Sequence, residues 1–194
     1  MQAFLISTGI VALAEMGDKT QLLALVLAAR FRKPWPIVWG ILVATLANHA
    51  LAGAVGAWLT TFMGTAVGPD VLRWVLGLSF IAMALWMLIP DKLDDGAAAK
   101  VPRFGVFATT AVAFFLAEMG DKTQIATVML AARYNAFLAV VAGTTLGMML
   151  ANAPVVWLGE RMTRLIPLRS VHRVSAAIFA VLGVVALVGW GSGQ

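Results

Sequence analysis

The eight residues Ala14-Glu-Met-Gly-Asp-Lys-Thr-Gln21 decide how this chain is organised, because they return unchanged at positions 117–124. The agreement continues to Leu27-Ala-Ala-Arg30, which matches residues 130–133 at the same offset. A repeat of this length predicts that the chain consists of two halves with similar structures.

Weaker echoes extend the repeat beyond the motif: Gly40 aligns with Gly143, Asn48 with Asn152, and Phe80 with Phe179. Between the halves lies a polar stretch that is rich in Asp and Lys. We therefore expect a first repeat at residues 1–90, a linker at 91–103 and a second repeat at 104–194.

The composition indicates that both halves lie in a lipid bilayer. Apolar residues make up 61% of the 194 residues and charged residues only 12%, against about 45–50% and about 25% in soluble domains. There is no cysteine, which excludes a disulfide scaffold. The net charge of +5 is explained by the basic loops of membrane proteins, so nucleic acid is not expected as a partner.

Six apolar stretches are long enough to cross a bilayer, for which about 20 residues suffice. They cover approximately residues 3–29, 36–60, 71–90, 104–132, 137–159 and 173–191. We expect an all-α integral membrane protein with six transmembrane helices, three in each half. Because three is odd, the halves must cross the membrane in opposite directions, as the inverted repeats of many secondary transporters do.

The basic residues predict the orientation. Ten lie in or at the ends of the connections after the first, third and fifth stretches, whereas the opposite side holds only Arg73 and Arg133. The ten are Arg30, Arg32, Lys33, Lys92, Lys100, Arg103, Arg161, Arg164, Arg169 and Arg173. Since cytoplasmic loops carry the excess of Lys and Arg, we expect the linker in the cytoplasm and both termini outside it.

The motif places four carboxylates inside the membrane, Glu15, Asp18, Glu118 and Asp121. They lie near the middle of their stretches, where a charge costs at least about 2.5–3.5 kcal/mol and is usually functional. In a continuous helix, residues at i and i+3 share one face. We therefore expect the four acids to bind a divalent cation where the two halves meet.

Lysines and glycines accompany the acids in both copies of the motif. Lys19 and Lys122 are expected to pair with the glutamate one turn away or to extend toward an interface, rather than to act on the ion directly. Gly17 and Gly120 are hinge candidates, because glycine lets a helix open or another backbone approach closely. Close helix packing is the alternative explanation for both glycines.

The surrounding polar residues narrow the choice of ion. Oxygen-bearing side chains that could extend the cation and proton pathway are Thr20, Gln21, Asn48, Thr123, Gln124 and Asn152. Oxygen ligands suit Mg²⁺, Ca²⁺ or Mn²⁺, whereas Zn²⁺ and copper favour His or Cys. The asparagines either line the site or form interhelical hydrogen bonds. His49 has no counterpart in the other half and is interpreted as a polar packing residue.

Two methionines, Met16 and Met119, stand directly beside the glutamates. A thioether there would favour Mn²⁺ over Ca²⁺. On an intact helix, however, neighbouring side chains lie about 100° apart. A core-facing or lipid-facing role is therefore the simpler interpretation of both residues.

The signature Glu-x-Gly-Asp-Lys-Thr occurs at Glu15–Thr20 and at Glu118–Thr123 without departure. With six spans, inverted halves and a polar linker, the whole chain resembles uncharacterised protein family 0016, the family of transmembrane protein 165 and of bacterial manganese exporters of the MneA type. The resemblance implies a transporter of Mn²⁺ and Ca²⁺ that exchanges metal for protons. It also implies a bacterial inner (plasma) membrane location and no enzymatic activity.

These observations favour export of Mn²⁺, with Ca²⁺ as a further candidate, by cation/proton antiport. The sequence contains no Gly-x-x-x-x-Gly-Lys-Ser/Thr loop for ATP, so a proton gradient is the expected energy source and no cofactor is expected. A passive divalent-cation channel is an alternative, as is an intramembrane enzyme that uses paired acids. Metal preference, proton stoichiometry, the number of bound ions and the oligomeric state stay open.

Overall fold

The computed structural model describes residues 1–66, 68–89, 105–159 and 168–188, which form eight helices and no strand. In the first half these are α1 (Gln2–Glu15), α2 (Lys19–Phe31), α3 (Pro34–Ala66) and α4 (Gly68–Met87). In the second half they are α5 (Val106–Glu118), α6 (Lys122–Tyr134), α7 (Phe137–Leu158) and α9 (Leu168–Val188). The expected all-α architecture is confirmed, and the linker 91–103 lies outside the described residues.

The first and fourth apolar stretches are not the continuous helices that the sequence predicted. α1 ends at Glu15 and α2 begins at Lys19, while α5 ends at Glu118 and α6 begins at Lys122. Three residues of extended or left-handed backbone separate the helices in each pair. The expectation that Glu and Asp share one helix face is therefore wrong, because a helix boundary lies between them.

Two described helices are by themselves long and apolar enough to cross a membrane, over Pro34–Phe62 in α3 and Phe137–Leu158 in α7. Shorter apolar helices cover Gln2–Glu15, Arg73–Met87, Val106–Glu118 and Arg173–Val188. α1 and α5 fall into this shorter class because each break ends the helix partway along its apolar stretch.

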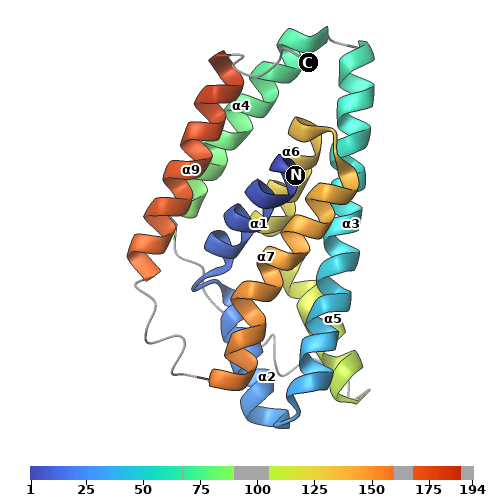
Figure 1. The fold of residues 1–194 in the computed structure, drawn as a ribbon, viewed down its shortest axis with the longest axis vertical. Coiled ribbons are helices and arrows are strands. Elements are labelled where there is room, and N and C mark those ends of the chain that lie inside the picture. Colours follow the sequence, from blue (N-terminus) through green and yellow to red (C-terminus); the bar gives the residue numbers. More distant parts are fainter. Residues whose placement is uncertain (67, 90–104, 160–167, 189–194) are drawn as a thin grey trace.

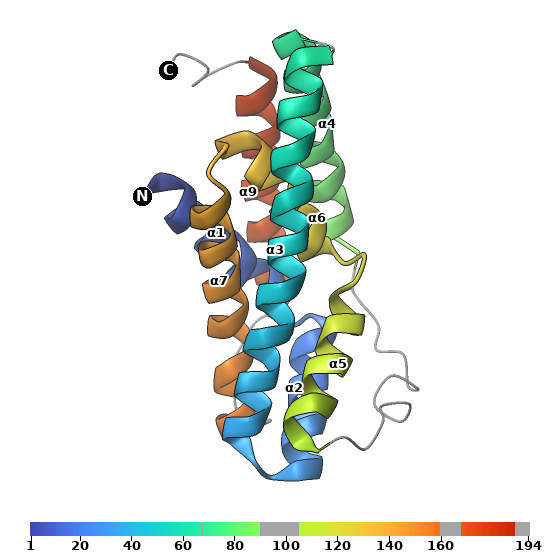
Figure 2. The same ribbon diagram turned by 90° about the vertical axis from the view of Figure 1, so that its right-hand side faces the viewer.

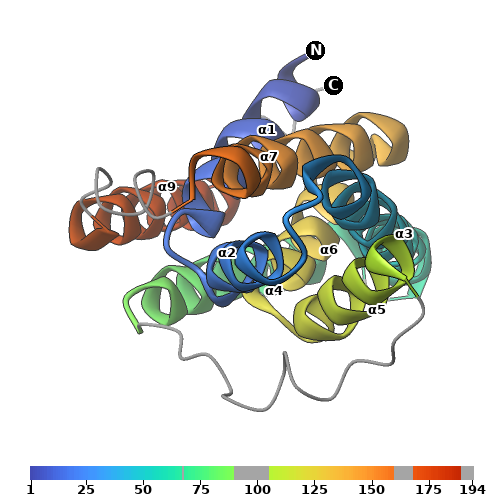
Figure 3. The same ribbon diagram turned by 90° about the horizontal axis from the view of Figure 1, so that it is seen from below.

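The second half runs opposite to the first. In Figure 1, α1 and α2 descend, α3 ascends and α4 descends, whereas α5 and α6 ascend, α7 descends and α9 ascends. Extensive packing also crosses between the halves: α1 lies against α7, α5 against α3, and α4 against α9. Figure 2 shows α1 beside α7 from the side, and Figure 3 shows α4 and α9 together at one edge from below.

Two glycines show that this packing is equivalent in the two halves. Gly40 of α3 lies so close to α5 that an added Cβ would be 2.9 Å from the carbonyl oxygen of Phe107. Gly143 of α7 approaches α1 in the same way, and its added Cβ would be 2.5 Å from the carbonyl oxygen of Phe4. Phe4 and Phe107 are themselves separated by the offset of the repeat. The echo between Gly40 and Gly143 therefore reflects a shared close contact between helix backbones.

A paired contact also joins α4 to α9. The rings of Phe80 and Phe179 are fully buried, and their centroids lie 6.2 Å apart. Gly77 and Gly183 bring the two helices together, since a Cβ added at either would lie about 3 Å from the carbonyl oxygen of the other. The last helices of the two halves thus form a close-packed pair.

Candidate functional site

Each helix break places a buried glutamate at the end of one helix and a threonine at the start of the next. The Thr20 hydroxyl donates to Glu15 Oε2 at 2.6 Å, and the Thr123 hydroxyl donates to Glu118 Oε2 at 2.9 Å. Both carboxylates are fully buried. The two halves therefore hold their glutamates by the same contact, made across the break.

The glutamines of the motif stabilise the open backbone. Gln21 Oε1 accepts the backbone N–H of Gly17 at 2.9 Å, and Gln124 Oε1 accepts that of Gly120 at 2.7 Å. The contact at Gly17 is partly buried, where a backbone group that leaves the helical hydrogen-bond pattern needs such a partner. Gln21 Nε2 also donates to the carbonyl of Ala151 in α7, so the first break is attached to the second half.

The aspartates immediately precede the first residues of the following helices. Asp18 is the N-cap residue of α2 and Asp121 that of α6, and both side chains are buried. The positive end of a helix dipole favours a negative charge at this position. The breaks thus place two buried acids near helix N-termini, as discontinuous helices in transporters do.

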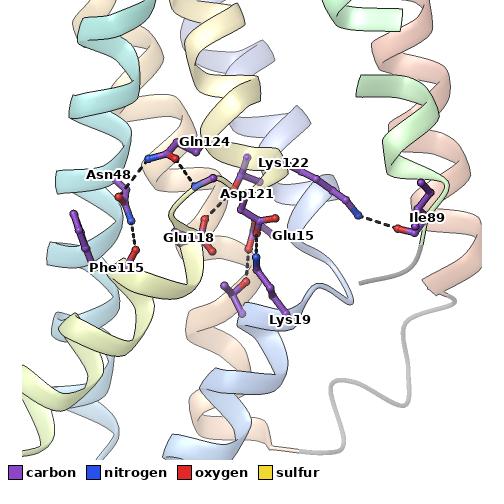
Figure 4. A network of polar contacts seen from close by, with 12 residues as sticks. Glu15, Lys19, Asn48, Ile89, Phe115, Glu118, Asp121, Lys122 and Gln124 are labelled. Atoms are coloured by element: carbon purple, nitrogen blue, oxygen red, sulfur yellow. Dashed lines mark hydrogen bonds and ion pairs between the residues drawn. The ribbon is translucent and has the colours of Figure 1, made fainter. Parts of the chain in front are cut away.

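The lysines do not pair with the glutamate one turn away, which was one of the two alternatives expected from the sequence. Lys19 Nζ lies 3.2 Å from Asp121 Oδ2, in the other half, rather than pairing with Glu15 one turn away. This ion pair joins the two breaks directly (Figure 4). Lys122 Nζ donates to the carbonyl of Ile89 just beyond α4, at 2.9 Å. The i, i+4 pairing fails because the helix boundary redirects both side chains.

The two asparagines have different partners. Asn152 Nδ2 donates to Glu15 Oε2 at 3.3 Å, which places this side chain against a motif acid. Asn48 Nδ2 donates to the carbonyl of Phe115 in α5, and Asn48 Oδ1 accepts from Gln124 at 3.5 Å (Figure 4). Asn152 therefore contacts the candidate site, whereas Asn48 forms an interhelical hydrogen bond next to it.

Three buried acceptor atoms remain available at the site. Glu15 Oε1, Glu118 Oε1 and Asn152 Oδ1 have no hydrogen-bond partner among the described residues. An unsatisfied buried acceptor costs about 1–3 kcal/mol, and a charged one more, so these atoms would be stabilised by a proton or a cation. Within the same residues, no three His, Cys, Asp or Glu side chains approach closely enough to hold one metal ion. The four acids do not form a closed cage in this conformation.

The methionines near the motif lie in different surroundings. Met119 is 57% exposed and Met16 is half-buried, which fits the lipid- or core-facing interpretation. Sequence reasoning missed Met148, a fully buried residue whose Sδ lies 3.0 Å from Asn152 Nδ2. The i, i+4 spacing of Met148 and Asn152 in an apolar stretch was the available signal.

His49 is fully buried beside Asn48, and its ring nitrogens have no hydrogen-bond partner in the described part of the chain.

The glycines of the breaks have positive φ angles, +84° at Gly17 and +74° at Gly120. A Cβ added at Gly120 would meet nothing within 4 Å. Close packing therefore does not explain this glycine, and its backbone conformation does, since other residues adopt it at a cost of about 1–2 kcal/mol.

We accordingly expect Gly120→Ala to lower both the thermal stability and the transport rate of the purified protein. Gly9→Ala is the matched control, because an added Cβ at Gly9 also meets nothing within 4 Å while Gly9 lies inside helix α1. The control should be neutral or slightly stabilising, because alanine favours the helix. Equal effects of the two substitutions would show that the backbone conformation at Gly120 is not required.

A helical bundle in which two discontinuous helices bring buried charges together between two halves has the architecture of a secondary transporter. Comparisons with known proteins agree with this transporter architecture. The family described as "Divalent cation/proton antiporter GDT1" matches residues 3–95 and 106–193, and this chain belongs to that family. The resemblance drawn from the motif is thereby confirmed, and the two matched ranges each contain one copy of it.

The similar proteins come from bacteria and plants. A Vibrio cholerae protein described as "Putative manganese exporter" is 50% identical over 185 residues, which cover 95% of this chain and 90% of that protein. "GDT1-like protein sll0615" of Synechocystis is 29% identical over 203 residues, covering 96% and 97%. "GDT1-like protein 3" of Oryza sativa subsp. indica is 28% identical over 199 residues, covering 91% and 70%. No solved structure matches the chain.

Proposed function

We propose that this chain exports Mn²⁺ from the bacterial cytoplasm across the inner membrane in exchange for protons, with Ca²⁺ as a second substrate. The observation that carries the proposal is the pair of helix breaks, each with buried acids, joined across the halves by Lys19 and Asp121. The identity with the Vibrio protein supports manganese as the metal, and the family supports coupling to protons.

The proposed topology has six spans in two inverted repeats, residues 1–90 and 104–194, joined by the linker 91–103. Opposite chain directions in the two halves and the equivalent contacts of Gly40 and Gly143 support it. The excess of Lys and Arg in the odd-numbered connections favours a cytoplasmic linker and external termini. A cysteine would be introduced at Ala98, and a labelling reagent would be added outside intact cells. Labelling of that cysteine would contradict this orientation.

The proposed substrate site consists of Glu15, Asp18, Glu118 and Asp121, with Thr20, Thr123, Asn152 and the two motif glutamines holding the breaks open. Glu15 Oε1 and Glu118 Oε1, which lack hydrogen-bond partners among the described residues, would each accept a proton or contact a metal ion. Because the same atoms serve both ligands, metal binding would release protons, and binding of protons would release the metal.

Alternating access follows from the arrangement of the breaks. Each break is attached to its own half by the motif threonine and to the other half by contacts such as that of Gln21 with Ala151. Movement of one half against the other would therefore change both breaks at once. In an inverted repeat, such a movement exchanges the conformations of the halves and exposes the central site to the opposite side of the membrane.

Proteoliposomes that contain the purified protein and an Mn²⁺-sensitive dye test the function. We expect a proton gradient to drive Mn²⁺ accumulation against its concentration gradient and reversal of the proton gradient to reverse the net flux. Metal flux that equilibrates but does not respond to the proton gradient would replace the antiporter by a passive channel. The absence of Mn²⁺ flux from folded protein in both gradients would refute transport of this metal.

A further inference from the structure

Three acceptors converge on the side-chain nitrogen of Asn152 in α7. Asn152 Nδ2 lies 3.3 Å from Glu15 Oε2, 3.2 Å from the carbonyl oxygen of Met148 and 3.0 Å from Met148 Sδ. All three residues are fully buried. A carboxylate, a backbone carbonyl and a thioether thus surround one point that is now occupied by an electropositive N–H group.

Acceptors grouped in this way are suited to bind a cation. The other amide atom, Asn152 Oδ1, and the other carboxylate atom, Glu15 Oε1, have no hydrogen-bond partner among the described residues. Rotation of the amide by half a turn would exchange its nitrogen and oxygen and direct the oxygen toward Glu15. A cation bound beside the rotated amide oxygen would then meet oxygen from Glu15 and Asn152 and sulfur from Met148.

The matching position in the other half offers no sulfur. The echo of Asn48 with Asn152 aligns Met148 with Ala44, which is buried in α3. Glutamates, threonines, glutamines and asparagines agree between the halves, so the thioether is a chemical difference between two otherwise matching sets of side chains. A residue required only by the repeated architecture would be expected in both halves.

We propose that Met148 determines metal selectivity by presenting its thioether to an ion held by Glu15 and Asn152, which favours Mn²⁺ over Ca²⁺ and Mg²⁺. This inference rests on the proposed transport of Mn²⁺. Ca²⁺ and Mg²⁺ take oxygen ligands almost exclusively, whereas sulfur ligands favour transition metals. One thioether among oxygens would therefore add affinity for Mn²⁺, and more for the softer Cd²⁺, without adding affinity for Ca²⁺.

Met148→Leu tests the proposal, since leucine preserves the buried volume and removes only the sulfur. Transport of Mn²⁺, Cd²⁺ and Ca²⁺ would be measured in proteoliposomes with the full-length protein. We expect the Mn²⁺ over Ca²⁺ preference to fall about tenfold, which corresponds to about 1.4 kcal/mol, and Cd²⁺ transport to fall more. Met83→Leu, a buried methionine of the core around α4, is the matched control and should leave both preferences unchanged.

The outcomes separate this inference from the proposed function. Wild-type protein that does not exchange Mn²⁺ for protons refutes the function, whereas unchanged selectivity in an active Met148→Leu variant refutes only the inference. If the variant does not fold, X-ray absorption at the manganese edge of the selenomethionine-labelled, Mn²⁺-loaded wild type decides. Selenium in the first coordination shell supports the proposal, and a shell of oxygen alone overturns it.

Discussion

Glu118→Gln is expected to reduce Mn²⁺ transport to the background of empty liposomes, although the first motif stays intact. Glutamine retains an oxygen that can accept from the Thr123 hydroxyl, which now donates to Glu118 at 2.9 Å. The substitution therefore removes the charge and the proton-binding group while preserving the fold. If both halves form one site, loss of either glutamate removes a ligand from every transport cycle.

Initial rates of Mn²⁺ uptake at equal amounts of reconstituted protein measure the effect, which we expect to exceed about 100-fold, equivalent to about 2.7 kcal/mol. Asp70→Asn is the control, because Asp70 is an exposed carboxylate paired with Arg73 near the start of α4. It should keep the wild-type rate within a factor of about two. Half of the wild-type rate in Glu118→Gln would instead indicate two independent sites.

The second large effect concerns the ion pair between the halves. Lys19→Gln is expected to stop transport and to lower the free energy of unfolding, because Asp121 would remain buried without its cation. Breaking a fully buried pair costs about 3–5 kcal/mol. The Lys19 side chain is 26% exposed, so solvent screening reduces the expected loss to about 1–3 kcal/mol.

A double-mutant cycle separates the pair from its surroundings. We expect Lys19→Gln with Asp121→Asn to recover much of the stability, because no unpaired charge is left, but to remain inactive. Thermal unfolding in detergent is measured for the wild type, the two single variants and the double variant. Together these give the coupling energy between Lys19 and Asp121, which should exceed about 1 kcal/mol. Arg73→Gln removes one partner of the exposed pair with Asp70 and serves as the control. If the effects of Lys19→Gln and Asp121→Asn on stability were additive, Lys19 and Asp121 would not interact in solution.

The repeat made the equivalence of several contacts in the two halves predictable from the sequence. Each copy of the motif lies in an apolar stretch, and matching positions in the structure make matching contacts, as Thr20 and Thr123 do with their glutamates. Gly40 and Gly143 likewise occupy equivalent backbone contacts. Identical residues at matching positions make the same contacts only if the residues around them also match. The repeat in the sequence extends to those surrounding residues.

The helix breaks could not be read from hydrophobic periodicity, since the residues on both sides remain apolar. The available signal was the glycine between Glu15 and Asp18, because a positive φ there ends a helix. The partner of Lys19 was unpredictable for a different reason: Asp121 is distant in sequence, and only the packing of the halves brings them together. The same holds for Glu15 and Asn152, which belong to different halves.

The central claim is that Mn²⁺ and protons compete for buried carboxylates supplied by both halves. Titration of the purified full-length protein with Mn²⁺ in weakly buffered solution, with a pH indicator, tests it most directly. We predict release of at least one proton per bound Mn²⁺, saturating together with metal binding, and loss of this release in Glu15→Gln and Glu118→Gln. Saturable Mn²⁺ binding without proton release, or undiminished release in both variants, would contradict the claim.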